Sequence, residues 1–202
     1  MKKGVKVFAI VLSLLVYSMN AGAAGYKPGD VANDFKLENV DGQYISLGTY
    51  TEAKGFIVVF TCNHCPFSKA YEERIIELHK KYADLGYPVI AINPNDPVKS
   101  PEDSFDKMKE LANEKAYPFP YLFDAKQAVA AAFGATRTPH VFVLTNDGKQ
   151  RTVRYIGAID DNSDDSSSVK ERYVENAVNG LISEGKVKVQ ETKAIGCTIK
   201  WK

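Results

Sequence analysis

The sequence has few cysteines, no excess of charge of either sign, and only one long apolar run. Three cysteines in 202 residues are too few for a disulfide-stapled scaffold, so the fold depends on burial of apolar side chains. An odd count leaves at least one thiol unpaired or only transiently paired. Lys and Arg number 26 and Asp and Glu 25, so no basic surplus is available to neutralise nucleic-acid phosphates. A hydrophobic content of 45% is typical of a globular protein, and the length predicts one domain.

The one long apolar run has the pattern of an export signal. Residues 2–6 carry three lysines, residues 5–16 are largely apolar, and Ala21-Gly22-Ala23 supplies the small side chains of a cleavage site. The run is too short to span about 30 Å of hydrocarbon, which argues against a membrane anchor. We therefore predict a signal peptide over residues 1–23, cleaved near Ala23, and export to an oxidising compartment such as a periplasm or the medium.

Strand and helix patterns alternate along the rest of the chain. Alternating or continuous apolar runs predict strands at 35–37, 44–47, 56–60, 88–92, 140–145 and 152–157. Apolar residues at helical spacing, with capping residues, predict helices at 67–85, 101–116, 124–133 and 169–184. The acidic, serine-rich segment 160–168 predicts a solvated loop. This order favours an α/β fold in a single domain over 24–202, with a core at about 26–185 and a tail at 186–202.

The chemistry is concentrated in the turn between the strand at 56–60 and the helix that follows it. The turn reads Cys62-Asn63-His64-Cys65, and we expect the helix N-terminus to stabilise a Cys62 thiolate. Two intervening residues let Cys65 close a disulfide ring with Cys62, so the pair could exchange two electrons with a partner. His64 is a candidate for tuning the thiolate. Half of a zinc site and an inert disulfide remain as alternatives.

Several segments resemble the redoxin branch of the thioredoxin-like proteins. Thr138-Pro139 before a strand resembles the cis-proline loop of that fold. Residues 29–37, Cys62–Pro66 and Gly196–Trp201 resemble one subgroup, with a Cys-Asn-His-Cys-Pro motif, of the alkyl hydroperoxide reductase/thiol-specific antioxidant proteins. The resemblance covers about residues 26–202. It implies a central mixed sheet flanked by helices, with an N-terminal β-hairpin, an inserted helix, and a substrate groove shaped by Thr138 and Pro139.

Departures from that family bear on the choice between disulfide exchange and peroxide chemistry. A peroxiredoxin has a threonine three residues before its peroxidatic cysteine. In this sequence the residue three before Cys62 is Val59, and the residue three before Cys65 is Cys62, so neither cysteine has that threonine. The family's arginine aligns best with Pro139, although Arg137 is nearby and is a candidate substitute. Thioredoxins also have a buried carboxylate under the cysteines. The strand at 56–60 has none, so such a group must come from elsewhere.

The third cysteine, Cys197, admits two interpretations. Ile195 and Ile199 flank it closely, as expected for a buried thiol without chemistry. Alternatively, it is a resolving cysteine, as in some peroxiredoxins.

The hypothesis from sequence is an exported thiol–disulfide oxidoreductase. Cys62 would attack, Cys65 would resolve, and Cys197 and Arg137 would be accessory. No organic cofactor and no metal is expected. The expected partners are cysteine-containing exported proteins or small thiols, and a redox protein that recycles the pair. The alternatives are a thiol-dependent peroxidase resolved by Cys197, and a binding domain with an inert disulfide.

Overall fold

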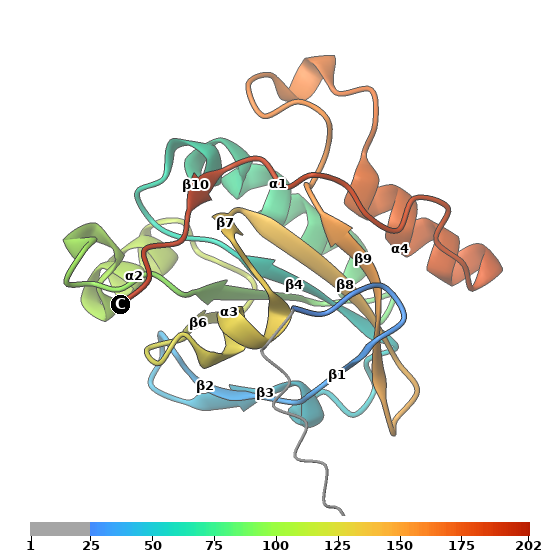
Figure 1. Cartoon of the computed structure of the whole chain (residues 1–202), viewed down its shortest axis with the longest axis horizontal. Coiled ribbons are helices and arrows are strands. Elements are labelled where there is room, and N and C mark those ends of the chain that lie inside the picture. The colour runs from blue at the N-terminus through green and yellow to red at the C-terminus, as the bar shows by residue number, and fades with distance from the viewer. Residues whose placement is uncertain (1–24) are drawn as a thin grey trace, which may run out of the picture.

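The computed structural model describes residues 25–202 and shows an α/β fold built on one large mixed sheet (Figure 1). The signal peptide predicted at 1–23 lies outside the described residues. The large sheet has eight strands in the order β1-β9-β8-β4-β5-β6-β2-β3, and β10 and β7 form a separate pair. None of the helices in the described part of the chain has the length and apolar character needed to cross a membrane.

The elements have the following bounds. The strands are β1 Val31–Ala32, β2 Lys36–Asn39, β3 Tyr44–Ser46, β4 Gly55–Phe60, β5 Val89–Asn93, β6 Tyr121–Phe123, β7 Arg137–Thr138, β8 His140–Asn146, β9 Arg151–Gly157 and β10 Cys197–Thr198. The α-helices are α1 Pro66–Tyr82, α2 Phe105–Glu114, α3 Ala128–Phe133 and α4 Tyr173–Glu184. Single 3-10 turns lie at η1 Leu47–Thr49, η2 Pro101–Asp103 and η3 Ser166–Ser168.

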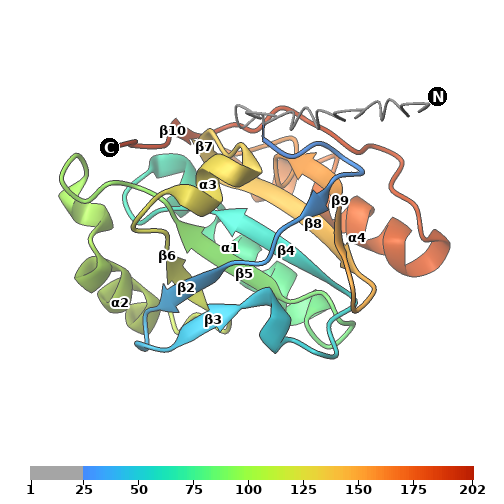
Figure 2. The same ribbon diagram turned by 60° about the horizontal axis from the view of Figure 1, so that its bottom comes forward.

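The central strand β4 organises the core. It pairs in parallel with β5 and antiparallel with β8, and all six of its residues are buried. Because side chains alternate across a sheet, Ile57 and Val59 pack with residues of α1, α2 and α4, whereas Phe56, Val58 and Phe60 pack with residues of α3. Figure 2 shows α3 on the near face of the sheet and α1 behind it. Helices on both faces account for the continuous apolar run in the sequence.

The structure confirms the main strands and helices and corrects several boundaries. The predicted hairpin forms as β2 and β3. The helix predicted at 101–116 divides into η2 and α2, because Ser104 has extended backbone angles between them. α3 begins only at Ala128, because Gln127 takes a left-handed conformation with φ of 58°, and the Asp124 carboxylate accepts instead from the Ala130 amide at 2.8 Å. The short strands β1, β6, β7 and β10 were not predicted.

The acidic segment at 160–168 is anchored at its start rather than wholly solvated. The Asp160 side chain is 2% exposed and accepts a hydrogen bond from the Arg74 guanidinium of α1 at 2.7 Å. Arg74 also donates to the carbonyl of Asn162 at 2.6 Å, and the Tyr71 hydroxyl donates to Asp160 at 2.9 Å. A buried ion pair with these additional partners holds the loop after β9 against α1.

Replacing Arg74 with methionine is expected to destabilise the protein by about 3–5 kcal/mol, since Asp160 would remain buried without its countercharge. Urea unfolding of the single variant measures this loss. The double variant Arg74→Met/Asp160→Asn should recover part of it, because no uncompensated charge remains. A single variant as stable as the parent would show that the pair contributes nothing to this packing.

Candidate active site

The turn after β4 places Cys65, not Cys62, at the start of α1. Cys65 is the N-cap of the 17-residue helix, and Pro66 follows at its first position. The amide at the first position of a helix has no partner within the helix, so proline, which lacks an amide hydrogen, is favoured there. This explains why the helix begins at Pro66. The expectation that Cys62 occupies the helix N-terminus is therefore wrong. Cys62 lies in the turn before the cap, and the position where the dipole favours a thiolate belongs to Cys65.

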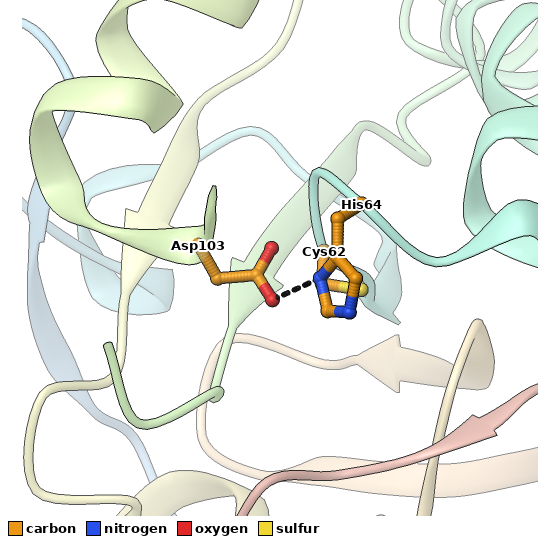
Figure 3. A group of neighbouring side chains, drawn as sticks. All are labelled: Cys62, His64 and Asp103. Carbon is orange, nitrogen blue, oxygen red and sulfur yellow. Dashed lines mark hydrogen bonds and ion pairs between the residues drawn. The ribbon is translucent and has the colours of Figure 1, made fainter. Parts of the chain in front are cut away.

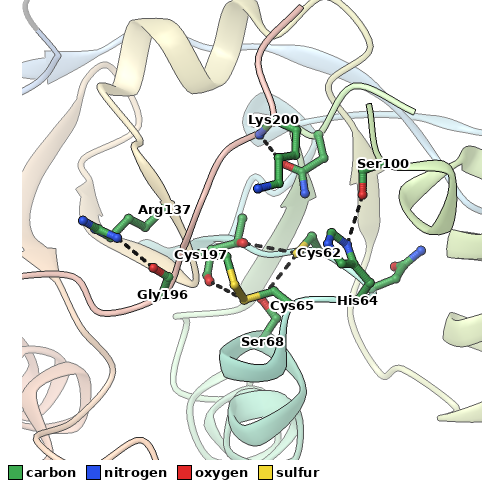
Figure 4. Close-up of a disulfide and its surroundings, with 12 residues drawn as sticks. Cys62, His64, Cys65, Ser68, Ser100, Arg137, Gly196, Cys197 and Lys200 are labelled. Atoms are coloured by element: carbon green, nitrogen blue, oxygen red, sulfur yellow. Dashed lines mark hydrogen bonds between the residues drawn. A yellow bond between two sulfur atoms is a disulfide. The ribbon is translucent and has the colours of Figure 1, made fainter. Parts of the chain in front are cut away.

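Cys65 forms a disulfide with Cys197, 132 residues further along the chain, and Cys62 is a free thiol (Figure 4). The Cα atoms of Cys65 and Cys197 are 6.1 Å apart, within the usual range for a disulfide. The interpretation of Cys197 as an unpaired thiol is thus wrong. The predicted disulfide between Cys62 and Cys65 is not formed in this structure.

Thr138 brings the three cysteines together. Its hydroxyl lies 3.2 Å from the Cys62 sulfur, its carbonyl oxygen lies 3.3 Å from the Cys65 sulfur, and its Cα is the antiparallel partner of Cys197. The Thr138–Pro139 peptide bond is cis, as the resemblance implied. The resemblance implied a substrate groove shaped by Thr138 and Pro139, but the β7 strand that ends at Thr138 is paired with β10.

The segment 186–202, which we call the C-terminal strap, is held on both sides of Cys197. On one side, the Thr192 amide donates to the Ile156 carbonyl of β9 at 2.9 Å. On the other, the Lys200 amide donates to the Asn95 side chain at 2.9 Å. Near the disulfide, Arg137 donates to the Gly196 carbonyl at 2.8 Å. None of these contacts depends on the disulfide, so they favour retention of Cys197 at the site after reduction.

Asp103 supplies the buried carboxylate that the strand at 56–60 lacks (Figure 3). It is 0% exposed and lies at the end of η2. Four groups donate to its oxygens: the Asn63 amide at 2.7 Å, the His64 Nδ1–H at 2.6 Å, the Ser100 hydroxyl at 2.7 Å and the Asn95 side-chain amide at 2.8 Å. The sequence analysis missed this residue. The local sequence, Ser100-Pro101-Glu102-Asp103, indicated only a helix cap. It did not indicate that Asp103 would contact the turn that contains the cysteines.

His64 is oriented by this carboxylate. Its side chain is 35% exposed, and a ring nitrogen, the Cys62 sulfur and an Asp103 oxygen all lie within 4.8 Å of one another. These atom types include metal ligands, but both oxygens of Asp103 already accept hydrogen bonds from protein donors. The arrangement instead fits an imidazole base whose Nδ1–H is held by a carboxylate, next to a thiol.

The environment of Cys62 disfavours its thiolate in this disulfide state. Burial raises the pKa of the Cys62 thiol above its ordinary value, and the negative charge of Asp103 raises it further. Hydrogen bonds from Thr138, the Cys65 amide and Ser68 lower the same pKa but do not outweigh the burial. The expectation of a readily ionised Cys62 is therefore wrong for this state, since Cys62 is 4% exposed and lies outside the helix cap.

Alkylation of Cys62 in the oxidised protein is expected to show a midpoint above pH ~8.5, the value for a free cysteine thiol. Because the folded-state pKa is raised, the associated stability is fully present below the unfolded-state pKa and is lost as the pH rises through the folded-state pKa. Iodoacetamide rates across alkaline pH, with urea midpoints at the same values, measure both effects. A midpoint below that of free cysteine would contradict this account of the site.

The fold and the site together define a thioredoxin-like protein with cysteines at the start of the helix after the central strand, opposite a cis-proline. The chain belongs to the AhpC/TSA family, whose model matches residues 28–156.

Three known proteins are similar to this chain in sequence or structure. It is 25% identical over 144 residues to the thiol-disulfide oxidoreductase ResA of Halalkalibacterium halodurans, covering 71% of this chain and 77% of ResA. An uncharacterized conserved protein from Geobacillus kaustophilus is 36% identical with a TM-score of 0.79, covering 89% of this chain and 94% of its own. A hypothetical protein from Sinorhizobium meliloti 1021 is 31% identical with a TM-score of 0.80, covering 88% and 96%. The family assignment supports an oxidoreductase in general terms.

Proposed function

We propose that this protein is an exported thiol–disulfide oxidoreductase whose exchange centre consists of Cys62, Cys65 and Cys197. The observation that carries the proposal is a free thiol beside a disulfide. The Cys62 sulfur and the Cys65 sulfur contact the hydroxyl and the carbonyl of the same residue, Thr138, at 3.2 and 3.3 Å. The curated relative is named a thiol-disulfide oxidoreductase, which supports the same chemistry.

In the proposed exchange, Cys65 changes partner between the two other cysteines. The Cys62 thiolate attacks the Cys65 sulfur, a Cys62–Cys65 bond forms, and the Cys65–Cys197 bond breaks to release a Cys197 thiolate. This step moves a disulfide without changing the oxidation state of the protein. The net reaction then requires an external thiol or disulfide to add or remove two electrons.

His64 is proposed to take the proton from the Cys62 thiol. Its Nδ1–H donates to Asp103 at 2.6 Å, which leaves Nε2 as the nitrogen with a lone pair for a proton. Both oxygens of Asp103 already accept from protein donors, so the carboxylate acts here by orienting the imidazole. In the thiolate state, the Thr138 hydroxyl and the Cys65 amide donate to the Cys62 sulfur.

The proposed partners are cysteine-containing exported proteins or small thiols, together with a redox protein that recycles the cysteines. Export rests on the pattern of residues 1–23. The mass of the protein from the periplasm or medium tests it: removal of residues 1–23 supports export, and a full-length cytoplasmic protein contradicts it. The exchange itself uses only side chains, so no organic cofactor enters this proposal.

A thiol-dependent peroxidase is the second candidate, and the Cys65–Cys197 disulfide favours it. In that reaction a Cys65 thiolate would take an oxygen from a peroxide, and Cys197 would displace water to form the observed bond. Against it, Arg137 donates to the Gly196 carbonyl at 2.8 Å instead of facing the sulfurs.

Two parallel assays distinguish these functions. With dithiothreitol as reductant, one follows reduction of a fluorescent glutathione disulfide and the other follows loss of hydrogen peroxide. The proposal expects catalytic turnover in the first assay and a near-background rate in the second. Turnover in the peroxide assay alone would replace the proposal with the peroxidase.

A further inference from the structure

We propose that Cys197 is the sulfur that an incoming thiolate attacks, and that Cys65 is the leaving group. This assignment rests on the proposed function and makes Cys197 a catalytic residue. It also implies that the first covalent adduct with an external thiol forms on the C-terminal strap, not in the Cys62–Cys65 turn.

Accessibility separates the three sulfurs. Cys65 is 0% exposed and Cys62 is 4% exposed, whereas Cys197 is only partly buried. The Cys65 sulfur lies 3.3 Å from the Thr138 carbonyl oxygen. Disulfide exchange requires the attacking sulfur to reach one of the two bonded sulfurs directly. Of the two cysteines in this disulfide, Cys197 is therefore the more exposed residue and the one that solvent-borne thiols are expected to reach.

The position of Cys65 at the start of α1 also favours Cys65 as the leaving group. Cys65 is the N-cap of α1, where unpaired amides and the helix dipole stabilise a thiolate. Cys197 lies in a two-residue strand and has no such stabilisation. Because the better-stabilised thiolate leaves faster, an external thiolate is expected to attack Cys197 and release Cys65. The internal exchange with Cys62 runs at Cys65 instead, because the Cys62 and Cys65 sulfurs both contact Thr138.

The charge of the strap indicates the class of thiol that fits. It contains one acidic residue, Glu191, and five lysines: Lys186, Lys188, Lys193, Lys200 and Lys202. Such a segment attracts anions, and the attacking species is itself a thiolate. We therefore assign the partner to thiols that carry carboxylates next to the sulfur, either as small molecules or on an acidic polypeptide segment.

The electrons and bonds balance over two thiols. The first thiolate bonds to the Cys197 sulfur, and the Cys65–Cys197 bond breaks with its electron pair on Cys65. A second thiolate then attacks the sulfur of the first thiol in this mixed disulfide, which gives a free disulfide and a Cys197 thiolate. Two external thiols are oxidised and one protein disulfide is reduced. The strap contacts at Thr192 and Lys200 hold Cys197 in place for the reverse reaction.

The decisive experiment traps the first adduct in the Cys62→Ser variant, in which Cys65 and Cys197 are the remaining cysteines. The oxidised variant is mixed briefly with glutathione, quenched with acid, alkylated with N-ethylmaleimide and mapped by mass spectrometry. The proposal expects glutathione on Cys197 and the alkyl group on Cys65. The opposite labelling overturns it. Turnover by the wild-type protein in the disulfide assay is independent of this result, so failure of the assignment is separable from failure of the proposed function.

A second arm tests the charge preference with glutathione and its dialkyl ester, which differ in the carboxylates. Glutathione should reduce the protein roughly threefold faster at low ionic strength after correction for thiol pKa, and added salt should remove the difference. Lys193→Gln/Lys202→Gln should lose this preference, whereas Lys149→Gln, in the turn between β8 and β9, should keep it. Equal rates for the two thiols overturn the assignment to carboxylate-bearing partners.

Discussion

Replacing Cys65 with serine is expected to reduce disulfide-exchange activity to the rate of the uncatalysed reaction. Cys65 is bonded to Cys197 in the structure and is the proposed partner of Cys62, so it is common to both disulfides. Cys62→Ser leaves the Cys65–Cys197 pair and should retain measurable turnover, whereas Cys197→Ser leaves only the buried Cys62 and Cys65 and should be slower than Cys62→Ser. Steady-state rates of the three variants with the same disulfide substrate provide the comparison.

The Cys65→Ser result is interpretable only if the variant folds. Loss of a native disulfide costs about 2–5 kcal/mol, so circular dichroism and urea unfolding must accompany the assay. Cys197→Ser is the matched control, because it removes the same disulfide and leaves Cys65 in place. Wild-type activity in a folded Cys65→Ser protein would contradict the central role of this sulfur.

Replacing Asp103 with alanine is expected to cost about 3–5 kcal/mol of stability, because it leaves several buried donors without an acceptor. The amide of Asn63, the side chain of Asn95 and the hydroxyl of Ser100 all donate to this carboxylate. Urea unfolding measures the loss. Glu102→Ala, at the neighbouring exposed position, is the control and should be close to neutral.

The milder variant Asp103→Asn separates charge from packing. The Asp103 charge raises the pKa of the Cys62 thiol, so its removal should lower that pKa and speed alkylation of Cys62 at neutral pH. His64 would at the same time lose the acceptor that orients it. An unchanged alkylation rate together with unchanged stability would show that Asp103 does not act on the cysteine turn.

Local patterns were sufficient to predict much of the framework. The continuous apolar run at 56–60 forms the buried central strand. The cis bond at Thr138-Pro139 was expected from the resemblance to the thioredoxin-like proteins. The Asp41-Gly42 turn joins the predicted hairpin strands. The strand and the hairpin are each specified by a few neighbouring residues, so side-chain periodicity and backbone preference decide them.

The features that were missed depend on contacts between distant parts of the chain. Cys197 reaches Cys65 across 132 residues, and no local pattern encodes that pairing. Asp103 lies in a segment whose residues indicated a helix cap, and its burial follows only from the packing of η2 against the turn at Asn63 and His64. The ionisation of Cys62 was mispredicted for the same reason, because its burial and its acidic neighbour are both tertiary.

Mapping the disulfides across a series of glutathione redox buffers tests the central claim most directly. Samples quenched with acid and alkylated are digested, and the cross-linked peptides are identified by mass spectrometry. The account predicts that Cys65 is found bonded to Cys197 and, in a second population, to Cys62, and that both bonds are reduced at potentials accessible to glutathione. A Cys65–Cys197 bond that resists reduction even below about −300 mV, with Cys62 never oxidised, would mark a structural bridge and contradict the account.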